Sequence, residues 1–454
     1  MTSALPTKPA MPSLRVQELR AMTRLAAPIV LAELGWMAMG IVDTMMVGRV
    51  GADAIAAVGL GAMLFYGIGI CASGVLLGLD TLVSQASGAG SPEECRRWLV
   101  NGVWVAALLM PLVMGGVRGL DLALPAFGIA PEVLRSTRPY LHALNWSAPA
   151  LLLYFAFRRY LQALHMVRPV MWTLITANLV NVAGNWVLVF GHFGAPRMGA
   201  EGSGWATCIS RLYMALALGA TLWRREPELR RVSWRPDSQR IAQLFGLGLP
   251  AAGQLGAEIA VFALVTVLIA RLNAISLAAN QIALTMVSTT YMLPLGISSA
   301  AAVRVGNALG RGDPKGAARS GWTALALGVA VMSIAAAALI SVPHPIARLF
   351  TPETDVIATA ATLLQIAAFF QLFDGLQVVG TGALRGAGET RTPMWCHLAG
   401  YWAIGLPLGA ELCFGRGLGA AGLWAGLSVG LILIGSVLTL AWRRTSRRFG
   451  DAAI

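Results

Sequence analysis

The stretch GAAGLWAGLSVGLILIGSVLTLAW, residues 419–442, contains no charged side chain and no strand-like alternation of polar and apolar residues. An α-helix needs about 20 predominantly apolar residues to cross a bilayer, so this stretch predicts a transmembrane helix. Eleven further segments are similarly apolar. They are residues 22–47, 54–80, 98–117, 139–161, 169–191, 201–223, 241–270, 277–303, 320–342, 357–383 and 393–414. The sequence therefore predicts an all-α polytopic membrane protein with twelve transmembrane helices.

The overall composition supports this prediction. Of the 454 residues, 57% are hydrophobic and 12% are charged, whereas a soluble domain carries about 25% charged residues. Such a chain has too little polar surface for a soluble enzyme, a disordered protein or a secreted disulfide-rich domain. Its five cysteines are scattered without a CxxC pair, and no GxxxxGK(S/T) motif indicates an ATPase.

The formal net charge of +13 is concentrated on one side of the predicted membrane. The N-tail, the C-tail and the loops after the even-numbered helices, together with the span ends next to them, hold 25 of the 34 Lys and Arg residues, against 8 in the other loops. Because positively charged loops stay in the cytoplasm during insertion, both termini are predicted to be cytoplasmic. This topological role leaves no basic polar domain for nucleic acid to bind.

The two halves of the chain match at an offset of 222 or 223 residues. Pro28 aligns with Pro250, and Phe127 aligns with Phe350. Each half contains six predicted spans, an even number, so both halves enter the membrane from the same side. Transporters built from two such parallel repeats bind their substrate between the repeats.

This repeat predicts five regions: a cytoplasmic N-tail, an N-lobe of helices 1–6, an inter-lobe linker, a C-lobe of helices 7–12 and a cytoplasmic C-tail. Their boundaries, in the same order, are residues 1–21, 22–223, 224–240, 241–442 and 443–454. We expect a cavity between the lobes that opens alternately to either side of the membrane.

Apart from Glu201 at the first position of one span, six acidic residues lie inside the predicted spans, where a charge costs about 2.5–3.5 kcal/mol on insertion scales. They are Glu33, Asp43, Asp80, Glu258, Asp374 and Glu411. Arg211 is the clearest basic residue at a matching depth, so most of these carboxylates are expected to lack a buried ion-pair partner. Each must then face water, bind a cation or hold a proton, and all three options suit a cation-coupled transporter.

Glu258 is a strong site candidate. Gln254 and Phe262 lie four residues on either side of it and share its helix face. A carboxylate between an amide and an aromatic ring suits an organic cation or a dehydrated inorganic one. The counterpart of Glu258 in the first half is Trp36, and Asp43 lies two turns further along the same stripe. The sequence predicts substrate contacts from these five residues.

Other polar residues within the spans are further candidates. Asp374 lies in the tenth predicted helix and is a second candidate ligand for the coupling cation. Asp80 has two interpretations, a functional carboxylate or one that only hydrogen-bonds a neighbouring backbone, and Glu33 is a secondary candidate. The histidines show no metal-binding spacing, although His397 could join a proton path. Three amides on one face of the fifth helix either bridge helices or coordinate ions: Asn178, Asn181 and Asn185.

Several motifs in combination resemble one known family. The first lobe contains MGIVDTMMVG at residues 39–48, AAVG at 56–59 and DTLVSQASGA at 80–89. The second contains AANQIA at 278–283, RVGNALG at 304–310 and LRGAGETRTPM at 384–394. From about residue 20 to residue 445, the chain resembles the multidrug and toxic compound extrusion (MATE) family in its NorM-like branch.

The resemblance implies a two-lobe exporter of cationic or amphipathic drugs, driven by antiport of Na⁺ or H⁺. It also implies that the helix-7 and helix-10 acids, here Glu258 and Asp374, form the coupling-cation site, where Na⁺ could bind. The helix-1 acid, here Asp43, is implicated in proton coupling or substrate release, whereas Glu33 belongs to no family motif. The resulting hypothesis is that the ion and the drug compete for the carboxylates.

The main alternative is a lipid-linked-precursor flippase of the same two-lobe superfamily, which a large basic central cavity would favour. A membrane-embedded enzyme would need a catalytic motif within its spans, and none is found, so a non-enzyme without a cofactor is predicted. A passive channel suits a two-lobe repeat less well than alternating access does. The predicted partners are small organic cations and the lipids of a bacterial inner membrane, with the protein as a monomer.

Overall fold

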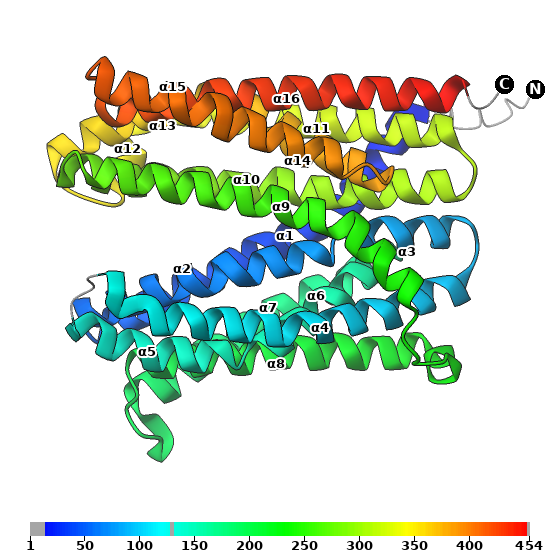
Figure 1. Cartoon of the computed structure of the whole chain (residues 1–454), viewed down its shortest axis with the longest axis horizontal. Helices are drawn as coiled ribbons and strands as arrows, with labels where there is room; N and C mark the ends of the chain where they lie inside the picture. The colour runs from blue at the N-terminus through cyan, green and yellow to red at the C-terminus, as the bar shows by residue number, and fades with distance from the viewer. Residues whose placement is uncertain (1–13, 128–130, 452–454) are drawn as a thin grey trace, which may run out of the picture.

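The computed structural model of the chain describes residues 14–127 and 131–451, in which it contains helices and no strand. The first lobe consists of α1 (Leu14–Gly48), α2 (Ala52–Val75), α3 (Gly78–Gly88), α4 (Pro92–Ala123), α5 (Pro131–Asn145), α6 (Ala148–Ala163), α7 (Val167–Phe190) and α8 (Ala200–Arg225). The second consists of α9 (Ser238–Ala270), α10 (Ala274–Gly310), α11 (Pro314–Ser341), α12 (Pro343–Arg348), α13 (Thr354–Gly386), α14 (Arg391–His397), α15 (Leu406–Ala410) and α16 (Gly419–Asp451). Figure 1 shows the two lobes side by side, with both termini at the same end of the molecule.

Ten helical stretches of the described chain are long and apolar enough to cross a membrane, and they correspond to ten of the twelve predicted spans. The other two spans are interrupted helices. The span predicted at 139–161 divides into α5 and α6, where Pro149 in the first turn of α6 has no N–H to donate. The span predicted at 393–414 comprises α14, α15 and two π-helical segments, η4 (Leu398–Gly405) and η5 (Glu411–Gly415). The predicted fold class is confirmed.

The interrupted eleventh span packs directly on α16 through glycines. A Cβ on Gly426 would lie 2.2 Å from the backbone N of Gly409, and one on Gly430 would lie 2.4 Å from the carbonyl oxygen of Gly400. Only glycine allows two helix backbones to approach this closely. The sequence motif Gly426-x-x-x-Gly430 is therefore a helix-contact motif, and it holds the irregular eleventh span in place.

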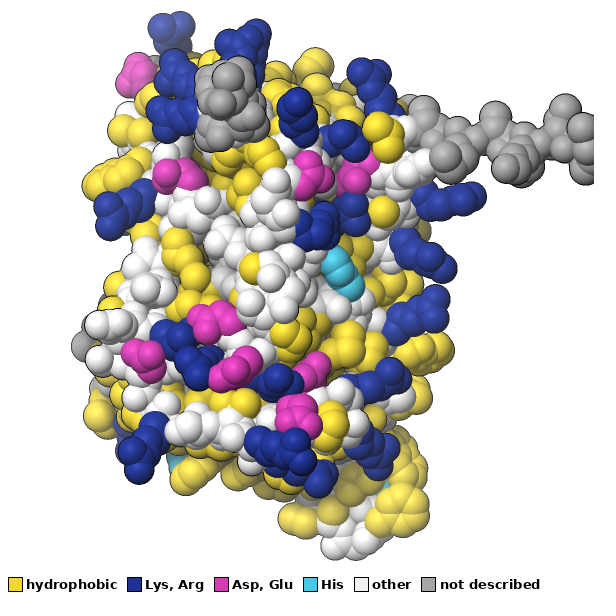
Figure 2. All heavy atoms as spheres, turned by 90° about the vertical axis from the view of Figure 1, so that its right-hand side faces the viewer, with side chains coloured by type: hydrophobic (Ala, Val, Ile, Leu, Met, Phe, Trp, Pro, Cys, Tyr) yellow, Lys and Arg dark blue, Asp and Glu magenta, His cyan; other side chains and the backbone are white. Residues whose placement is uncertain are grey.

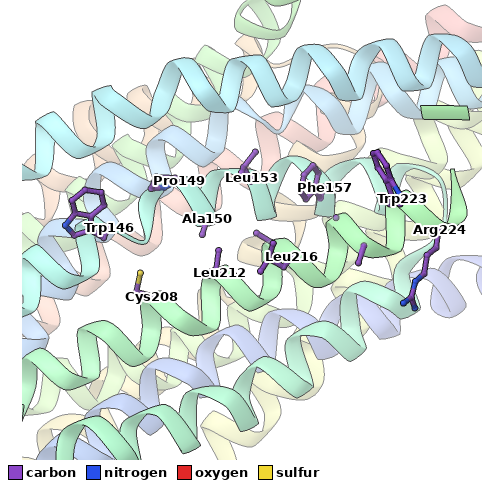
Figure 3. Close-up of a pocket in the computed structure, with 13 residues that line it drawn as sticks. Trp146, Pro149, Ala150, Leu153, Phe157, Cys208, Leu212, Leu216, Trp223 and Arg224 are labelled. Atoms are coloured by element: carbon purple, nitrogen blue, oxygen red, sulfur yellow. The ribbon is translucent and has the colours of Figure 1, made fainter. Parts of the chain in front are cut away.

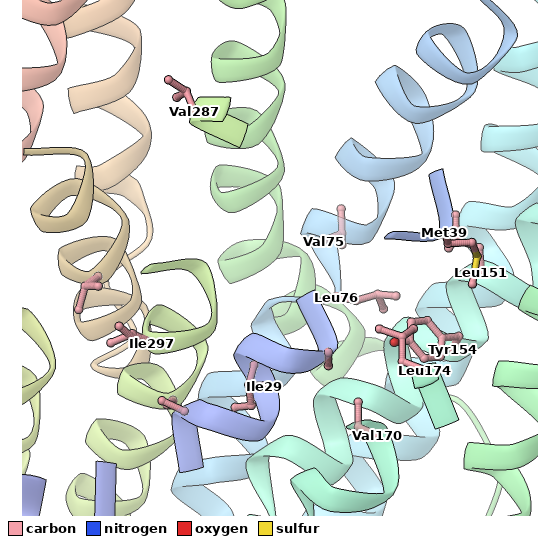
Figure 4. Close-up of a cluster of buried hydrophobic side chains, with 14 of the residues drawn as sticks. Ile29, Met39, Val75, Leu76, Leu151, Tyr154, Val170, Leu174, Val287 and Ile297 are labelled. Carbon is pink, nitrogen blue, oxygen red and sulfur yellow. The ribbon is translucent and has the colours of Figure 1, made fainter. Parts of the chain in front are cut away.

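The lobes are joined in the half of the molecule nearest the termini. Among the described residues, the hydrogen bonds and ion pairs between lobes all lie in this half; for example, Thr81 Oγ1 donates to the carbonyl of Arg385 at 2.5 Å. Apolar side chains of α1 and α10, including Ile29 and Ile297, also pack between the lobes (Figure 4). Toward the other end, Figure 1 shows α2 diverging from α10. The lobes therefore meet at one end and separate toward the other.

Candidate cation and substrate sites

α9 presents Gln254, Glu258 and Phe262 to α13 and the eleventh span, as their four-residue spacing predicts. Glu258 Oε1 accepts a hydrogen bond from Gln377 Nε2 at 3.3 Å. Glu258 Oε2 is buried and has no hydrogen-bond partner among the described residues, and it lies 3.9 Å from His397 Nε2. This second oxygen is therefore available to a proton or a cation.

α13 places Asp374 three residues before Gln377, and therefore on the helix face that carries the donor to Glu258. Asp374 is 3% exposed, and its Oδ2 has no hydrogen-bond partner in the described chain. Two carboxylates buried near the same amide repel each other unless a proton or cation is held there. The other buried polar residues of α13 extend the same face at three- and four-residue spacing: Gln371, Gln377, Thr381 and Arg385.

The eleventh span contributes His397 and Tyr401 to the C-lobe cluster, which also contains Glu258, Asp374 and Gln377. The Nε2 atoms of His397 and Gln254 lie 3.2 Å apart, and His397 Nδ1 is 2.7 Å from the carbonyl oxygen four residues earlier. Because a carbonyl can only accept, Nδ1 carries the hydrogen, and Nε2 accepts from the Gln254 amide. Tyr401 donates to Gln377 Oε1 at 3.2 Å, and its ring meets Phe262 edge-on. Glu258 thus lies among amides and aromatic rings.

Asp43 occupies a different environment, in the N-lobe. Its Oδ1 accepts hydrogen bonds from Asn181 at 3.0 Å and Asn185 at 2.7 Å, and its Oδ2 accepts from Thr207 Oγ1 at 2.8 Å. Asn178 instead donates to a backbone carbonyl of α1 at 2.9 Å. Of the three amides predicted on one face of α7, two therefore hold Asp43 and one bridges two helices.

Trp36 also belongs to the N-lobe. Its ring stacks on Tyr154 with centroids 6.0 Å apart, and the guanidinium of Arg211 lies 5.9 Å from its centre. Arg211 is fully buried and donates to Ser147 Oγ at 2.5 Å and to Tyr66 Oη at 2.9 Å. No hydrogen bond or ion pair within the described chain joins this group to Glu258. The five predicted substrate contacts are therefore divided between the two lobes.

The expectation that most of the intramembrane acids lack a buried ion-pair partner is wrong for Glu33 and Asp80. Glu33 forms an ion pair with Arg158, and both are buried. Asp80 Oδ2 lies 3.3 Å from Arg159 and 3.5 Å from Arg385 of the other lobe. These three arginines lie near the ends of predicted spans and were counted as loop charges, but helix packing buries them. The interpretation of Asp80 as a backbone acceptor alone is therefore also wrong.

Sequence reasoning missed several members of the two clusters. Gln377 lies three residues after Asp374, so the polar stripe on α13 was a visible signal for it. Tyr401 lies four residues after His397 and could have been found in the same way. Thr207 had no such signal, because its role depends on how α8 packs against α1.

Two six-helix lobes with carboxylates buried at membrane depth define the class of two-lobe membrane transporters. The chain belongs to the MatE family, whose family model matches residues 28–187 and 250–410. The two matched segments begin 222 residues apart, one in each lobe, which confirms the repeat inferred from the sequence.

Individual relatives match along almost the whole chain. The "Probable multidrug resistance protein NorM" of Mesorhizobium japonicum is 38% identical over 447 residues, covering 95% of this chain and 95% of that protein. The protein of the same name from Brucella suis is 35% identical over 446 residues, covering 94% and 93%. The eukaryotic MATE transporter AtDTX14 has a similar fold, with a TM-score of 0.87 at 21% identity over 97% of this chain and 100% of that one.

Proposed function

We propose that this protein is a secondary active multidrug efflux transporter that exports cationic and amphipathic organic compounds in exchange for Na⁺ or H⁺. The observation that carries the proposal is the C-lobe pair, in which Glu258 Oε2 and Asp374 Oδ2 are both buried without a hydrogen-bond partner in the described chain. The names of the NorM relatives support the substrate class.

Either ion suits this pair. A proton on one carboxyl would remove the repulsion between the two groups. Na⁺ would need further oxygen ligands, and Gln377, whose Nε2 donates to Glu258, carries an amide oxygen that could supply one. Within residues 14–127 and 131–451, no group of three or more His, Cys, Asp or Glu side chains could hold a metal ion, so amide oxygens would have to contribute.

Ion binding would drive export by competition. A cationic drug is attracted to the same carboxylates and to the ring faces of Phe262 and Tyr401. Neutralising Glu258 and Asp374 would weaken that attraction and release the drug. The ion can shift the transport equilibrium only by its difference in affinity for the two conformations.

The lobe contacts fit a conformation open to the outside. Both termini lie at the end where the lobes meet, and Figure 2 shows many Lys and Arg side chains on that face. We place this end in the cytoplasm of a bacterial cell, because positively charged segments are retained there. The ion pair of Asp80 with Arg159 and Arg385 would then help to close the cytoplasmic side.

The buried arginines already have carboxylate or hydroxyl partners, and this argues against a flippase for an anionic lipid-linked precursor. Such a substrate would need free positive charge in a central cavity. Each buried guanidinium of the described spans is instead held by a carboxylate or by hydroxyl groups: Arg158 by Glu33, Arg159 and Arg385 by Asp80, and Arg211 by Ser147 and Tyr66.

The test is efflux from liposomes that contain the purified full-length protein. Ethidium or norfloxacin transport is measured separately under an imposed Na⁺ gradient and an imposed H⁺ gradient. We expect efflux under one of them, and the gradient that supports it identifies the ion. Absence of efflux under both gradients, with flipping of a fluorescent anionic lipid, would establish the flippase alternative.

A further inference from the structure

An open apolar groove of about 730 Å³ runs between α6 and α8 on the first lobe (Figure 3). Its floor is made of small side chains, including Ala150 of α6 and Ala215 and Gly219 of α8. Larger residues such as Leu153 and Leu216 form its sides. The spacing of three and four residues along both helices aligns these residues into one continuous channel.

The groove faces away from the core of the lobe. The opposite face of α8 is packed inside, with Met214 and Leu218 both fully buried. On the groove side, Leu212 is 50% exposed and Leu216 is 64% exposed. Exposed leucines on a membrane-spanning helix contact acyl chains, so the groove opens toward lipid.

The end of the groove nearest the termini is cationic. Trp223 and Arg224 line it, and Arg225 follows directly (Figure 3). The acids closest in sequence are already paired, Glu226 with Arg96 at 3.7 Å and Glu228 with Arg231 at 3.1 Å. Within the described chain, neither Arg224 nor Arg225 has a carboxylate partner. An apolar channel therefore ends at two exposed positive charges, and a third, the guanidinium of Arg230, lies 4.6 Å from the centre of the Trp223 ring.

We propose that this groove binds an anionic phospholipid of the cytoplasmic leaflet. One acyl chain lies along the small residues between α6 and α8, and the phosphate lies at Arg224 and Arg225. Trp223 stands at the depth where aromatic rings favour the headgroup region. Anionic lipids are attracted by each nearby arginine, so two unpaired guanidiniums select them over zwitterionic lipids. The assignment does not depend on the transported substrate.

The headgroup preference is tested by titrating lipids into the delipidated full-length protein and measuring binding by native mass spectrometry. The probes are dioleoyl phosphatidylglycerol and dioleoyl phosphatidylcholine, which share their acyl chains. We expect phosphatidylglycerol to bind more tightly, and R224Q/R225Q to weaken its binding about tenfold or more. The control R443Q/R444Q removes two exposed arginines from the end of α16. Equal binding of the two lipids, or equal effects of the two double variants, would overturn the proposal.

A groove-filling variant tests the acyl-chain site. A Cβ on Gly219 would lie 3.4 Å from Phe157, an ordinary contact, so the side chain of Gly219→Leu extends into the groove without displacing backbone. We expect this variant to bind both lipids more weakly while its thermal midpoint in detergent stays close to that of the wild type. Unchanged lipid binding in a folded Gly219→Leu protein would show that the groove is not the site.

Discussion

The two lobes bury their acids in different ways. In the first lobe, Asp43 receives three hydrogen bonds, and Glu33 and Asp80 form ion pairs with arginines, although Asp80 Oδ1 has no hydrogen-bond partner in the described chain. In the second lobe, Glu258 and Asp374 each retain an oxygen without a partner in the described chain. A carboxylate whose acceptor positions are filled stabilises packing, whereas one with an open position can exchange a proton or cation. We therefore expect ion exchange to depend most strongly on the second lobe.

Neutralising the C-lobe pair should give the largest functional effect. We expect Glu258→Gln or Asp374→Asn to lower the initial rate of gradient-driven efflux in liposomes by about tenfold or more, the equivalent of about 1.4 kcal/mol. The control is Glu411→Gln, because Glu411 lies on the same lobe but is exposed. Efflux at the wild-type rate in either C-lobe variant, or a larger loss in Asp43→Asn, would contradict the expectation that ion exchange depends most strongly on the second lobe.

The fold could be predicted from the sequence because the patterns that indicate it can be recognised without knowing how the helices pack. Twelve apolar stretches and the alignment of Pro28 with Pro250 require no knowledge of helix packing. The same holds for Glu258 and Gln254, which share a face at four-residue spacing. The ion pairs between side chains of different helices could not be predicted, because they depend on how deep each residue lies in the membrane. Arg158 stands near the end of a predicted span, and only packing against α1 brings it to Glu33.

Breaking the Glu33–Arg158 pair should destabilise the first lobe. Arg158 is 1% exposed and Glu33 is 6% exposed, and removing one partner leaves an uncompensated buried charge. We expect Arg158→Met to lower the free energy of unfolding by about 3–5 kcal/mol, and Glu33→Met/Arg158→Met to recover most of it. Both changes in the free energy of unfolding are measured by unfolding the variants in detergent and monitoring tryptophan fluorescence.

The exposed pair of Glu93 and Arg97 is the matched control for this prediction. Their side chains are 68% and 51% exposed, so Arg97→Met should change the free energy of unfolding by only about 0–1 kcal/mol. Equal losses in Arg97→Met and Arg158→Met would mean that burial does not distinguish the two pairs. A double variant at Glu33 and Arg158 as unstable as the single one would assign the loss to packing.

A smaller effect is expected when one hydrogen bond to Asp43 is removed. Thr207→Val keeps the side-chain shape but deletes the hydroxyl that donates to Asp43 Oδ2. Leaving that buried oxygen without its donor should lower the free energy of unfolding by about 1–3 kcal/mol. The control Thr285→Val removes a hydroxyl that bonds only within its own helix. Equal unfolding free energies for the two variants would show that Asp43 does not depend on its hydrogen bonds.

The smallest effect should come from Asp237, an acid between the lobes that faces water. Its carboxylate caps α9, and the backbone N–H of Arg240 is the main cause that lowers its pKa, followed by the backbone N–H of Gln239 and the side chain of Arg240. A lowered pKa in the folded state means that this acid stabilises the protein above its ordinary pKa, about 3.9. That contribution is lost as the pH falls through the folded value.

The thermal midpoint of Asp237→Ala should accordingly lie slightly below that of the wild type at pH 6. The gap should stay nearly constant down to about pH 4 and narrow below it, because only the charged carboxylate is stabilised in the folded state. Differential scanning fluorimetry in detergent at successive pH values measures this gap. A gap that persists unchanged below the folded pKa would show that the aspartate acts through uncharged contacts. The exposed Asp237 would then stabilise the protein mainly through its hydrogen bonds, as we expect for the buried Asp43.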